Sequence, residues 1–145
     1  MKTMVMEQQK IHLIKLEKGE DLLKSILKYV KERSIGSGFL TGIGALATAK
    51  IGYFDIEKKR YLENITHNVE LIACMGNIAI NKDNHEPIAH VHITVADREG
   101  RTLGGHLNEG SIVSVTAEIY LVETRPFVYR KKEEETGLHL LDPKN

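Results

Sequence analysis

The sequence contains no tryptophan, one cysteine, three prolines and no excess of charge of either sign. Twenty lysines and arginines balance twenty aspartates and glutamates, so the formal net charge is zero when the histidines are neutral. Such a chain has no long-range field that would attract it to nucleic acid or to an anionic membrane. Aromatic residues make up only 6% of the chain, which also disfavours a surface that stacks on nucleic-acid bases.

The single cysteine, Cys74, excludes an internal disulfide and lies in an apolar run, where it can serve as a small hydrophobic residue. Charged residues already occur within residues 1–7, which leaves no room there for the apolar segment of a signal peptide. No apolar run approaches the about 20 residues that a membrane-spanning helix requires. We therefore expect a cytoplasmic protein that does not contact membranes. The length of 145 residues suits a single domain with a substantial core.

The most informative stretch of the sequence is a predicted β-hairpin over residues 85–107 that carries three histidines. In its first arm, residues 89–95 alternate between apolar side chains and the polar side chains of His90, His92 and Thr94. This period of two is typical of a half-buried strand, so both histidines point to the same face. Asp97 to Gly100 form a type I turn sequence, with Asp first and Gly last, which favours a three-residue loop with a glycine bulge.

In that register His92 lies directly opposite His106, and His90 lies on the diagonal. Directly opposed residues have Cβ atoms about 5 Å apart, so three imidazoles could reach one ion. Neutral imidazole is a good zinc ligand, and three protein ligands with one open position form a zinc site that keeps a water. The sequence therefore indicates a divalent-metal site on His90, His92 and His106, and zinc is the first candidate for the bound ion. No carboxylate near these histidines is identified as a supporting residue.

Two alternatives compete with the metal site. Histidines can simply be the polar residues on the solvated face of a strand. In addition, a two-residue turn at Arg98 and Glu99 would place His106 opposite Val91, on the other face of the hairpin. A one-residue shift of the pairing register turns every side chain of a strand to the opposite face.

The rest of the sequence predicts more strand than helix. A helix begins after Asp21, follows an apolar periodicity from Leu22 to Val30, and ends near Ser34, with Gly36 as a left-handed cap. Strands are predicted over residues 10–16, 47–55, 60–66, 68–80 and 111–123, and an edge strand over 127–130. In the last long strand Val113, Val115, Ala117, Ile119 and Leu121 are expected on one face. His139 lies in a tail whose leucines are expected to dock on the body, and no role is predicted for it.

Two carboxylates are candidates for acid–base chemistry. Glu70 lies in the strand 68–80, which is apolar on both faces, so a structural partner such as an arginine or a raised pKa is expected. Glu118 lies on the polar face of the strand 111–123 and could support the histidines or contact water. One helix cannot cover both faces of the strand 68–80, so contact with another subunit is expected there.

The glycine-rich run from Gly36 to Gly44 does not predict a phosphate-binding loop. It lacks a Gly-Lys-Ser/Thr ending, and it follows a helix, which reverses the order of a dinucleotide-binding fingerprint. We interpret these glycines as bulges or as places where another backbone approaches closely.

Taken in order, these features resemble the plants and prokaryotes conserved (PPC) domain. The resemblance rests on one helix after an N-terminal strand, and on Gly36-Ser37-Gly38-Phe39, Gly42-Ile43-Gly44-Ala45, Val69-Glu70-Leu71, Gly76-Asn77, His90-Val91-His92, Gly104-Gly105-His106-Leu107, Thr116-Ala117-Glu118 and Thr136-Gly137-Leu138. It implies an α+β fold with a mostly antiparallel β-sheet, one main α-helix and a homotrimer. The single domain would span residues 10–141, between a flexible segment 1–9 and a tail 142–145. The histidines match what looks like a metal position in some prokaryotic members.

Three functions are compatible with the sequence. The first is a binding or regulatory module that assembles with two copies of itself as a homotrimer and contacts other proteins and a small ligand. The second is a zinc-dependent hydrolase or lyase, in which zinc on the triad activates water and Glu70 or Glu118 moves the proton. The third is a DNA-binding protein, as the domain follows AT-hook segments in plants. This sequence lacks the Arg-Gly-Arg-Pro core of an AT-hook, so DNA binding ranks last.

Overall fold

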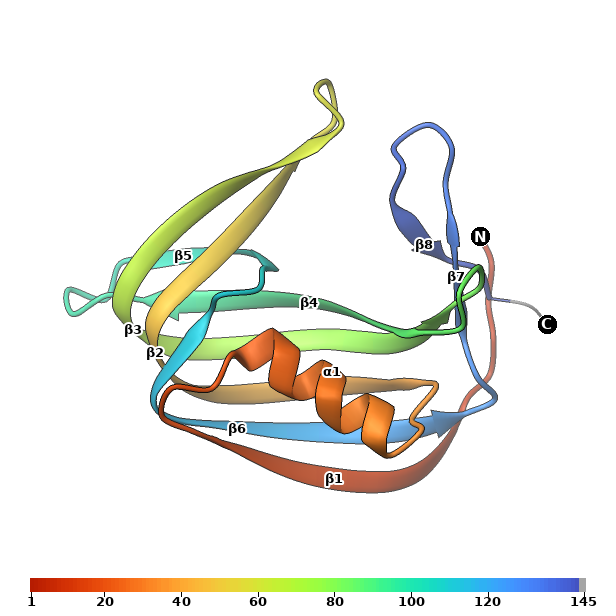
Figure 1. Cartoon of the computed structure of the whole chain (residues 1–145), viewed down its shortest axis with the longest axis horizontal. Coiled ribbons are helices and arrows are strands. Elements are labelled where there is room, and N and C mark those ends of the chain that lie inside the picture. The colour runs from red at the N-terminus through yellow and green to blue at the C-terminus, as the bar shows by residue number, and fades with distance from the viewer. Residues whose placement is uncertain (144–145) are drawn as a thin grey trace.

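The computed structural model describes residues 1–143, and within them the chain forms eight strands and one helix (Figure 1). Their bounds are β1 (Glu7–Glu17), α1 (Leu22–Glu32), β2 (Gly38–Asp55), β3 (Arg60–Asn81), β4 (Pro87–Ala96), β5 (Thr102–Leu107), β6 (Ile112–Arg125), β7 (Tyr129–Lys132) and β8 (His139–Leu141). All pairings are antiparallel except the short pairing of β3 with β7. The predicted α+β fold with a mostly antiparallel sheet and one helix is confirmed.

The sheet is organised around β2 and β3, which form one long, bent hairpin. Residues 38–46 of β2 pair with β3 on one side and β6 on the other, while residues 51–52 pair with β3 and β5. Because β5 also pairs with β4, and β4 with β3, these four strands close into a ring. Figure 1 shows the far end of the β2–β3 hairpin as an arm that rises from the sheet. The sequence had predicted shorter strands here, since register shifts interrupt the alternation without ending the strands.

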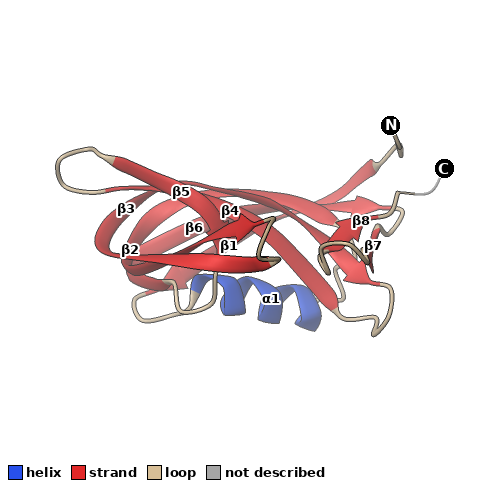
Figure 2. Ribbon diagram, turned by 90° about the horizontal axis from the view of Figure 1, so that it is seen from above, coloured by secondary structure: helices blue, strands red, loops and turns tan. Residues whose placement is uncertain are grey.

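The helix α1 covers one face of the sheet (Figure 2). The carboxylate of Asp21 caps its N-terminus by accepting a hydrogen bond from the backbone N–H of Lys24. Leu22, Ile26 and Val30 are fully buried against the sheet, as their helical spacing predicts. The predicted cap is wrong, because Ser34 takes the left-handed conformation, with φ of 53°. Gly36 is required for packing instead, as a Cβ there would lie 2.6 Å from the ring of Phe127.

Close backbone packing explains the glycines in the centre of the sheet, as the sequence predicted. A Cβ on Gly44 would lie 2.4 Å from the carbonyl oxygen of Thr116 on β6. A Cβ on Gly76 would lie 2.3 Å from the carbonyl oxygen of His90 on β4. Both obstacles are backbone atoms of the neighbouring strand, so no side chain can move aside to make room.

Replacing Gly76 with alanine is therefore expected to lower the free energy of unfolding by about 1–3 kcal/mol, the usual cost of overpacking. Urea denaturation at fixed protomer concentration measures this change. Gly104→Ala on β5 is the matched control, since its nearest atom, the carbonyl oxygen of Ile93, is 3.1 Å away. Equal destabilisation by the two substitutions would contradict the close approach of β3 and β4.

The sheet face opposite α1 carries exposed apolar side chains that lie in register across neighbouring strands. Pairing aligns two rows of residues on this face. One row is Leu13, Tyr120, Thr41, Met75, His92 and His106, and the other is Ile11, Val122, Phe39, Asn77 and His90. Ile43, Ile72 and Val115 add to the exposed apolar surface. The face is therefore apolar over β1, β6, β2 and β3, and it ends in the histidines on β4 and β5.

Val115 was predicted to share one face of the strand with Val113 and Ala117, and this is wrong. Its side chain is 70% exposed. The cause is a register shift, because Gly44 pairs with Ala117 whereas Leu46 pairs with Val113. Residues 114–116 of β6 form a bulge, which turns Val115 to the exposed face.

The C-terminal strands β7 and β8 form a hairpin that rises beside the β2–β3 arm (Figure 1). Tyr129 and Arg130 of β7 pair with the end of β3, close to the predicted edge strand. The predicted docking of the last leucines is only partly confirmed. Leu138 is half-buried and lines a cavity together with Tyr61 and Ile88. Leu140 and Leu141 remain 46% and 44% exposed, because they lie in a small hairpin that projects from the body. Of the predicted tail, residues 144–145 lie outside the described part of the chain.

Candidate metal centre

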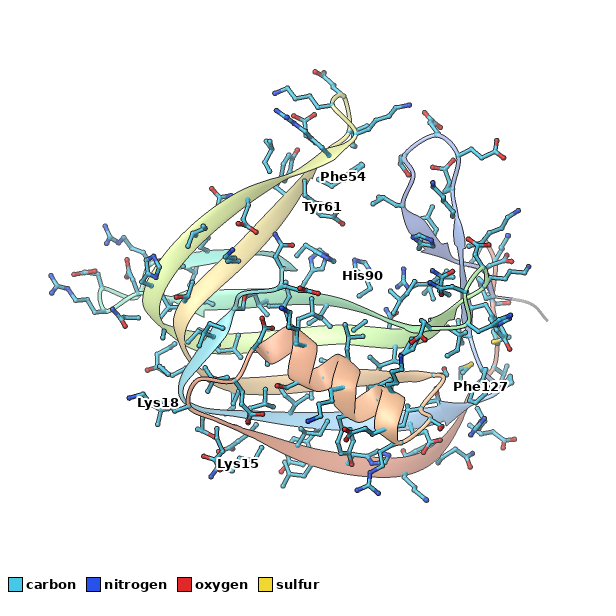
Figure 3. The ribbon with its side chains drawn as sticks, in the orientation of Figure 1. Lys15, Lys18, Phe54, Tyr61, His90 and Phe127 are labelled. Carbon is cyan, nitrogen blue, oxygen red and sulfur yellow. The ribbon has the colours of Figure 1, made fainter. Side chains whose placement is uncertain are left out.

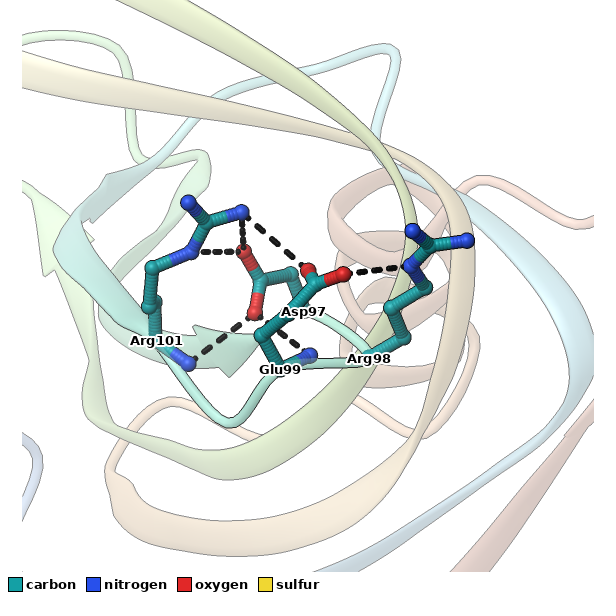
Figure 4. Close-up of polar contacts among 4 residues, drawn as sticks. All are labelled: Asp97, Arg98, Glu99 and Arg101. Atoms are coloured by element: carbon teal, nitrogen blue, oxygen red, sulfur yellow. Dashed lines mark hydrogen bonds and ion pairs between the residues drawn. The ribbon is translucent and has the colours of Figure 1, made fainter.

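The turn between β4 and β5 fixes the register of the histidine hairpin. The backbone N–H of Gly100 donates to the carbonyl of Asp97, and the N–H of Asp97 donates to the carbonyl of Arg101. The Asp97 carboxylate also accepts hydrogen bonds from the backbone N–H groups of Glu99 and Arg101 and from the Arg101 side chain (Figure 4). Gly100 takes the left-handed conformation, with φ of 77°, that the bulged loop requires. The predicted three-residue loop is confirmed, and the two-residue alternative is wrong.

This register places the three histidines together. His92 pairs directly with His106, and the ring centroids of His90, His92 and His106 lie 5.1 to 5.6 Å from one another. One ring nitrogen from each histidine can be chosen so that all three lie within 4.8 Å of one another. His90 and His106 are partly buried, and His92 is exposed. The cluster thus has two sheltered rings and one ring that faces solvent.

The neighbours of the cluster shelter it from one side. The ring of Tyr61, on the β2–β3 arm, lies 4.9 Å from the ring of His106. Gly52 makes this possible, since a Cβ at that position would lie 2.9 Å from the Tyr61 ring. Figure 3 shows Tyr61 and His90 between the β2–β3 arm and the β7–β8 hairpin. Tyr61 was not predicted to belong to this site, because its position depends on the bend of the long hairpin.

The residues fit a small divalent metal ion. Nitrogen ligands of a tetrahedral zinc lie about 3.4 Å apart for Zn–N bonds of about 2.0–2.1 Å, so small side-chain rotations would bring these nitrogens into place. The Nδ1 atom of His106 is buried and has no hydrogen-bond partner within residues 1–143. An orphaned buried imidazole nitrogen is a group that a metal or a ligand would satisfy.

The surroundings favour the neutral imidazoles that bind metals. Burial and, to a smaller extent, the positive charges of His90, His92 and Arg130 together lower the pKa of His106 to about 4. Burial also lowers the pKa of His90, with smaller contributions from Arg130 and His92. A neutral ring can offer a lone pair at neutral pH without first losing a proton.

Metal-free protein is expected to lose stability as the pH falls from about 6.5 to about 4. In this range His106 is protonated in the unfolded chain but neutral in the folded one, so the unfolded state binds more protons and acid favours unfolding. The measurement is the urea midpoint at several pH values for the wild type and for His106→Gln. The variant should show a shallower slope in this window, and identical slopes would contradict the shifted pKa.

A cavity of about 240 Å³ adjoins the histidines, between the β2–β3 arm and the β7–β8 hairpin. It is lined by Tyr61, Ile88, Ala89, His90, His106, Arg130, Leu138, His139 and Leu140. His139, for which no role was predicted, lines this cavity, and its backbone carbonyl accepts a hydrogen bond from Arg130. No sequence pattern predicted a role for Arg130, because it lies far along the chain from the histidines.

The two candidate carboxylates lie elsewhere. Glu70 and Glu118 both line a separate cavity of about 460 Å³, together with Ile43, Ile72 and Val115. Glu70 was predicted to be enclosed by apolar residues and paired, but it is exposed and makes no ion pair or side-chain hydrogen bond within residues 1–143. The register shift between Leu71 and Ala73 turns it to the uncovered face. Cys74 is buried in the core, and burial raises the pKa of its thiol to about 12, so it is not a candidate ligand.

The sequence profile of the Plants and Prokaryotes Conserved (PCC) domain matches residues 4–125 of this chain. The match covers the helix, the histidine hairpin and all of the large strands. The chain belongs to this family. The resemblance inferred from the order of its motifs is thereby confirmed.

Solved structures with the same fold support the assignment of this PCC domain. A plant- and prokaryote-conserved protein from Pyrococcus horikoshii is 34% identical, with a TM-score of 0.89, over 100% of this chain and 99% of its own. A metal-containing protein from Archaeoglobus fulgidus is 29% identical, with a TM-score of 0.87, over 99% of this chain and 100% of its own. A candidate DNA-binding protein from Ralstonia eutropha is 26% identical, with a TM-score of 0.83, over 91% of this chain and 90% of its own.

Among curated proteins, the PCC domain is similar to part of a longer protein. The bifunctional protein GlmU of a Synechococcus species is 28% identical over 130 residues, which are 88% of this chain. The chain spans about a fifth of the length of the curated relatives it matches. Within residues 1–143, no helix is long and apolar enough to cross a membrane.

Proposed function

We propose that this PCC-domain chain is a homotrimeric binding module that holds a divalent metal on His90, His92 and His106. Zinc is the first candidate for this metal. The observation that carries the proposal is the convergence of three histidine nitrogens within 4.8 Å. Three imidazoles leave one coordination position open, which suits a site that binds a water or a small ligand. The relative from Archaeoglobus fulgidus is a metal-containing protein, which supports the same assignment.

The homotrimer is supported by the uncovered apolar face. Phe39, Ile43, Ile72, Met75 and Tyr120 each expose half or more of their surface on this side of the sheet. Exposed patches of this kind on a soluble domain mark interaction surfaces, and a second copy of the same surface supplies a matching apolar partner. Because the face runs in register into the histidine rows, assembly would place the metal site at the edge of a subunit contact.

A zinc-dependent hydrolase or lyase is the second candidate function. Zinc, when bound, would lower the pKa of a coordinated water to about 7 and so supply hydroxide. The specific observation that favours this function is the cavity beside His90 and His106, which gives a substrate access to the site. Glu70 and Glu118 line a different cavity, so within one chain they are poorly placed to move the proton.

DNA binding remains the third candidate. Its support is the similarity to candidate DNA-binding proteins, such as the one from Ralstonia eutropha. The zero net charge of this chain and the missing AT-hook core weigh against it. If DNA is bound, its affinity should fall steeply with salt concentration.

The proposal is tested with protein purified without a histidine tag. Elemental analysis should give close to one zinc per chain after dialysis against zinc and removal of the excess. Light scattering should give three times the 16.3 kDa mass of one chain. A metal-free protein under these conditions would reject the histidine site, and a monomer would reject the trimer.

A further inference from the structure

We propose that Arg130 binds the carboxylate of a small organic anion in the cavity between Tyr61 and the β7–β8 hairpin. The inference deepens the function proposed above and rests on it in one respect. The proposed histidine metal centre is the group that would lie beside the bound anion. The inference names the class of ligand for a cavity that neither the family nor the motifs predicted.

The first observation is a buried guanidinium without a counter-charge. Arg130 is only 4% exposed, and within residues 1–143 its side chain forms no ion pair. Both of its hydrogen-bond partners are neutral, the Oδ1 atom of Asn77 at 2.8 Å and the carbonyl oxygen of His139 at 2.7 Å. Burying a charge without an opposite charge is costly, so such groups are normally paired.

The second observation is the unused donor capacity of the same group. A guanidinium has five N–H donors, and the two hydrogen bonds of Arg130 use two of them. Its Nε atom is buried and has no partner among the described residues. Burial lowers the pKa of Arg130, as expected for a cation that lacks an anion. An incoming carboxylate would supply the missing charge and accept the remaining hydrogen bonds.

The third observation is the cavity into which Arg130 opens. Within the described chain no aspartate or glutamate lines it, and Arg130 is its only permanently charged group. Ile88, Ala89, Leu138 and Leu140 supply apolar walls, and Tyr61 adds an aromatic ring. The volume of about 240 Å³ lies below the roughly 300–1,000 Å³ of pockets for drug-sized ligands, so a small ligand fits.

These walls favour a carboxylate with a short apolar body over inorganic phosphate. A phosphate dianion is usually held by several cationic or backbone N–H donors, whereas this cavity offers one guanidinium among apolar side chains. His90 and His106 line the same cavity. A carboxylate on Arg130 would therefore hold the rest of the molecule next to the histidine centre.

The test uses the full chain, freed of metal with a chelator, at pH 8. Binding of acetate, butanoate and hexanoate is measured by saturation-transfer NMR, with butanamide as the uncharged analogue and inorganic phosphate as the competing anion. We expect butanoate to bind at least tenfold more tightly than butanamide, and affinity to rise from acetate to butanoate. Arg130→Gln should weaken butanoate binding at least tenfold and leave butanamide binding unchanged.

Arg98→Gln is the matched control, since its side chain is 91% exposed at the tip of the β4–β5 turn. It removes the same charge and should leave butanoate binding unchanged. If Arg130→Gln does not fold, Leu140→Trp fills the cavity without removing the guanidinium, and it should abolish butanoate binding. Equal effects of Arg130→Gln and Arg98→Gln would overturn the proposal. So would equal binding of butanoate and butanamide, or phosphate binding that outcompetes every carboxylate.

The outcome is independent of the metal. Butanoate binding that depends on Arg130 in a protein that fails to take up zinc would reject the histidine centre and keep the anion site. Zinc uptake by a protein that does not bind butanoate would reject the anion site and keep the histidine centre.

Discussion

Zinc binding is expected to disappear when His92 and His106 are both replaced with alanine. The two rings are opposed across β4 and β5, and their loss leaves His90 as the one remaining histidine of the cluster. Even partners that only support metal ligands typically change metal affinity about 10–100-fold, so losing two direct ligands should lower it by at least about 1,000-fold. Competition with a chromophoric zinc chelator measures the affinity of the untagged protein.

The matched control for this double variant also removes two imidazoles. His67→Ala combined with His85→Asn changes two histidines outside the cluster, and asparagine tolerates the left-handed conformation of residue 85, where φ is 61°. This control should bind zinc like the wild type. Unchanged zinc content in the His92 and His106 variant, or equal loss in both variants, would reject the histidine centre.

If the chain forms the proposed trimer through its apolar sheet face, replacing Ile43 with glutamate is expected to convert it into monomers. Ile43 is 59% exposed in the single chain and lies on the uncovered apolar face, beside Ile72 and Val115. A charge at an exposed position changes the stability of a monomer by about 0.5 kcal/mol or less, whereas an unpaired charge buried in an interface costs several kcal/mol. Light scattering at a series of protein concentrations distinguishes the two cases.

Ile56→Glu provides the comparison for this experiment. Ile56 is 73% exposed at the tip of the β2–β3 arm, away from the sheet face, so its substitution should leave the oligomeric state unchanged. If Ile43→Glu assembles as the wild type does, the apolar face is not the subunit contact. Circular dichroism of both variants checks that the fold is retained.

Much of the histidine site could be predicted because its determinants are local. The alternation around His90 and His92 and the turn residues from Asp97 to Gly100 together fix which residues oppose one another. A hairpin register depends on loop length and turn conformation, and both are encoded within a few neighbouring residues. The helix from Leu22 to Glu32 was predictable for the same reason.

The errors fall where distant segments meet. Val115 and Glu70 face the uncovered side of the sheet because of register shifts, which arise from how neighbouring strands pair. Gly36 was interpreted as a cap but is required by the ring of Phe127. None of these features has a periodic signal along the chain, since each depends on which atoms of a distant segment occupy the adjoining space.

The sequence by itself determined the α+β class, the family, and the alignment of three histidines on one face of a hairpin. Only the tertiary structure decided that Tyr61, Arg130 and His139 complete the surroundings of those histidines, and that Glu70 and Glu118 do not. The physical reason is one of range. Alternation and turn chemistry act between residues close in sequence, whereas the bend of β2 and β3 and the return of β7 bring together side chains that are 24 to 78 positions apart.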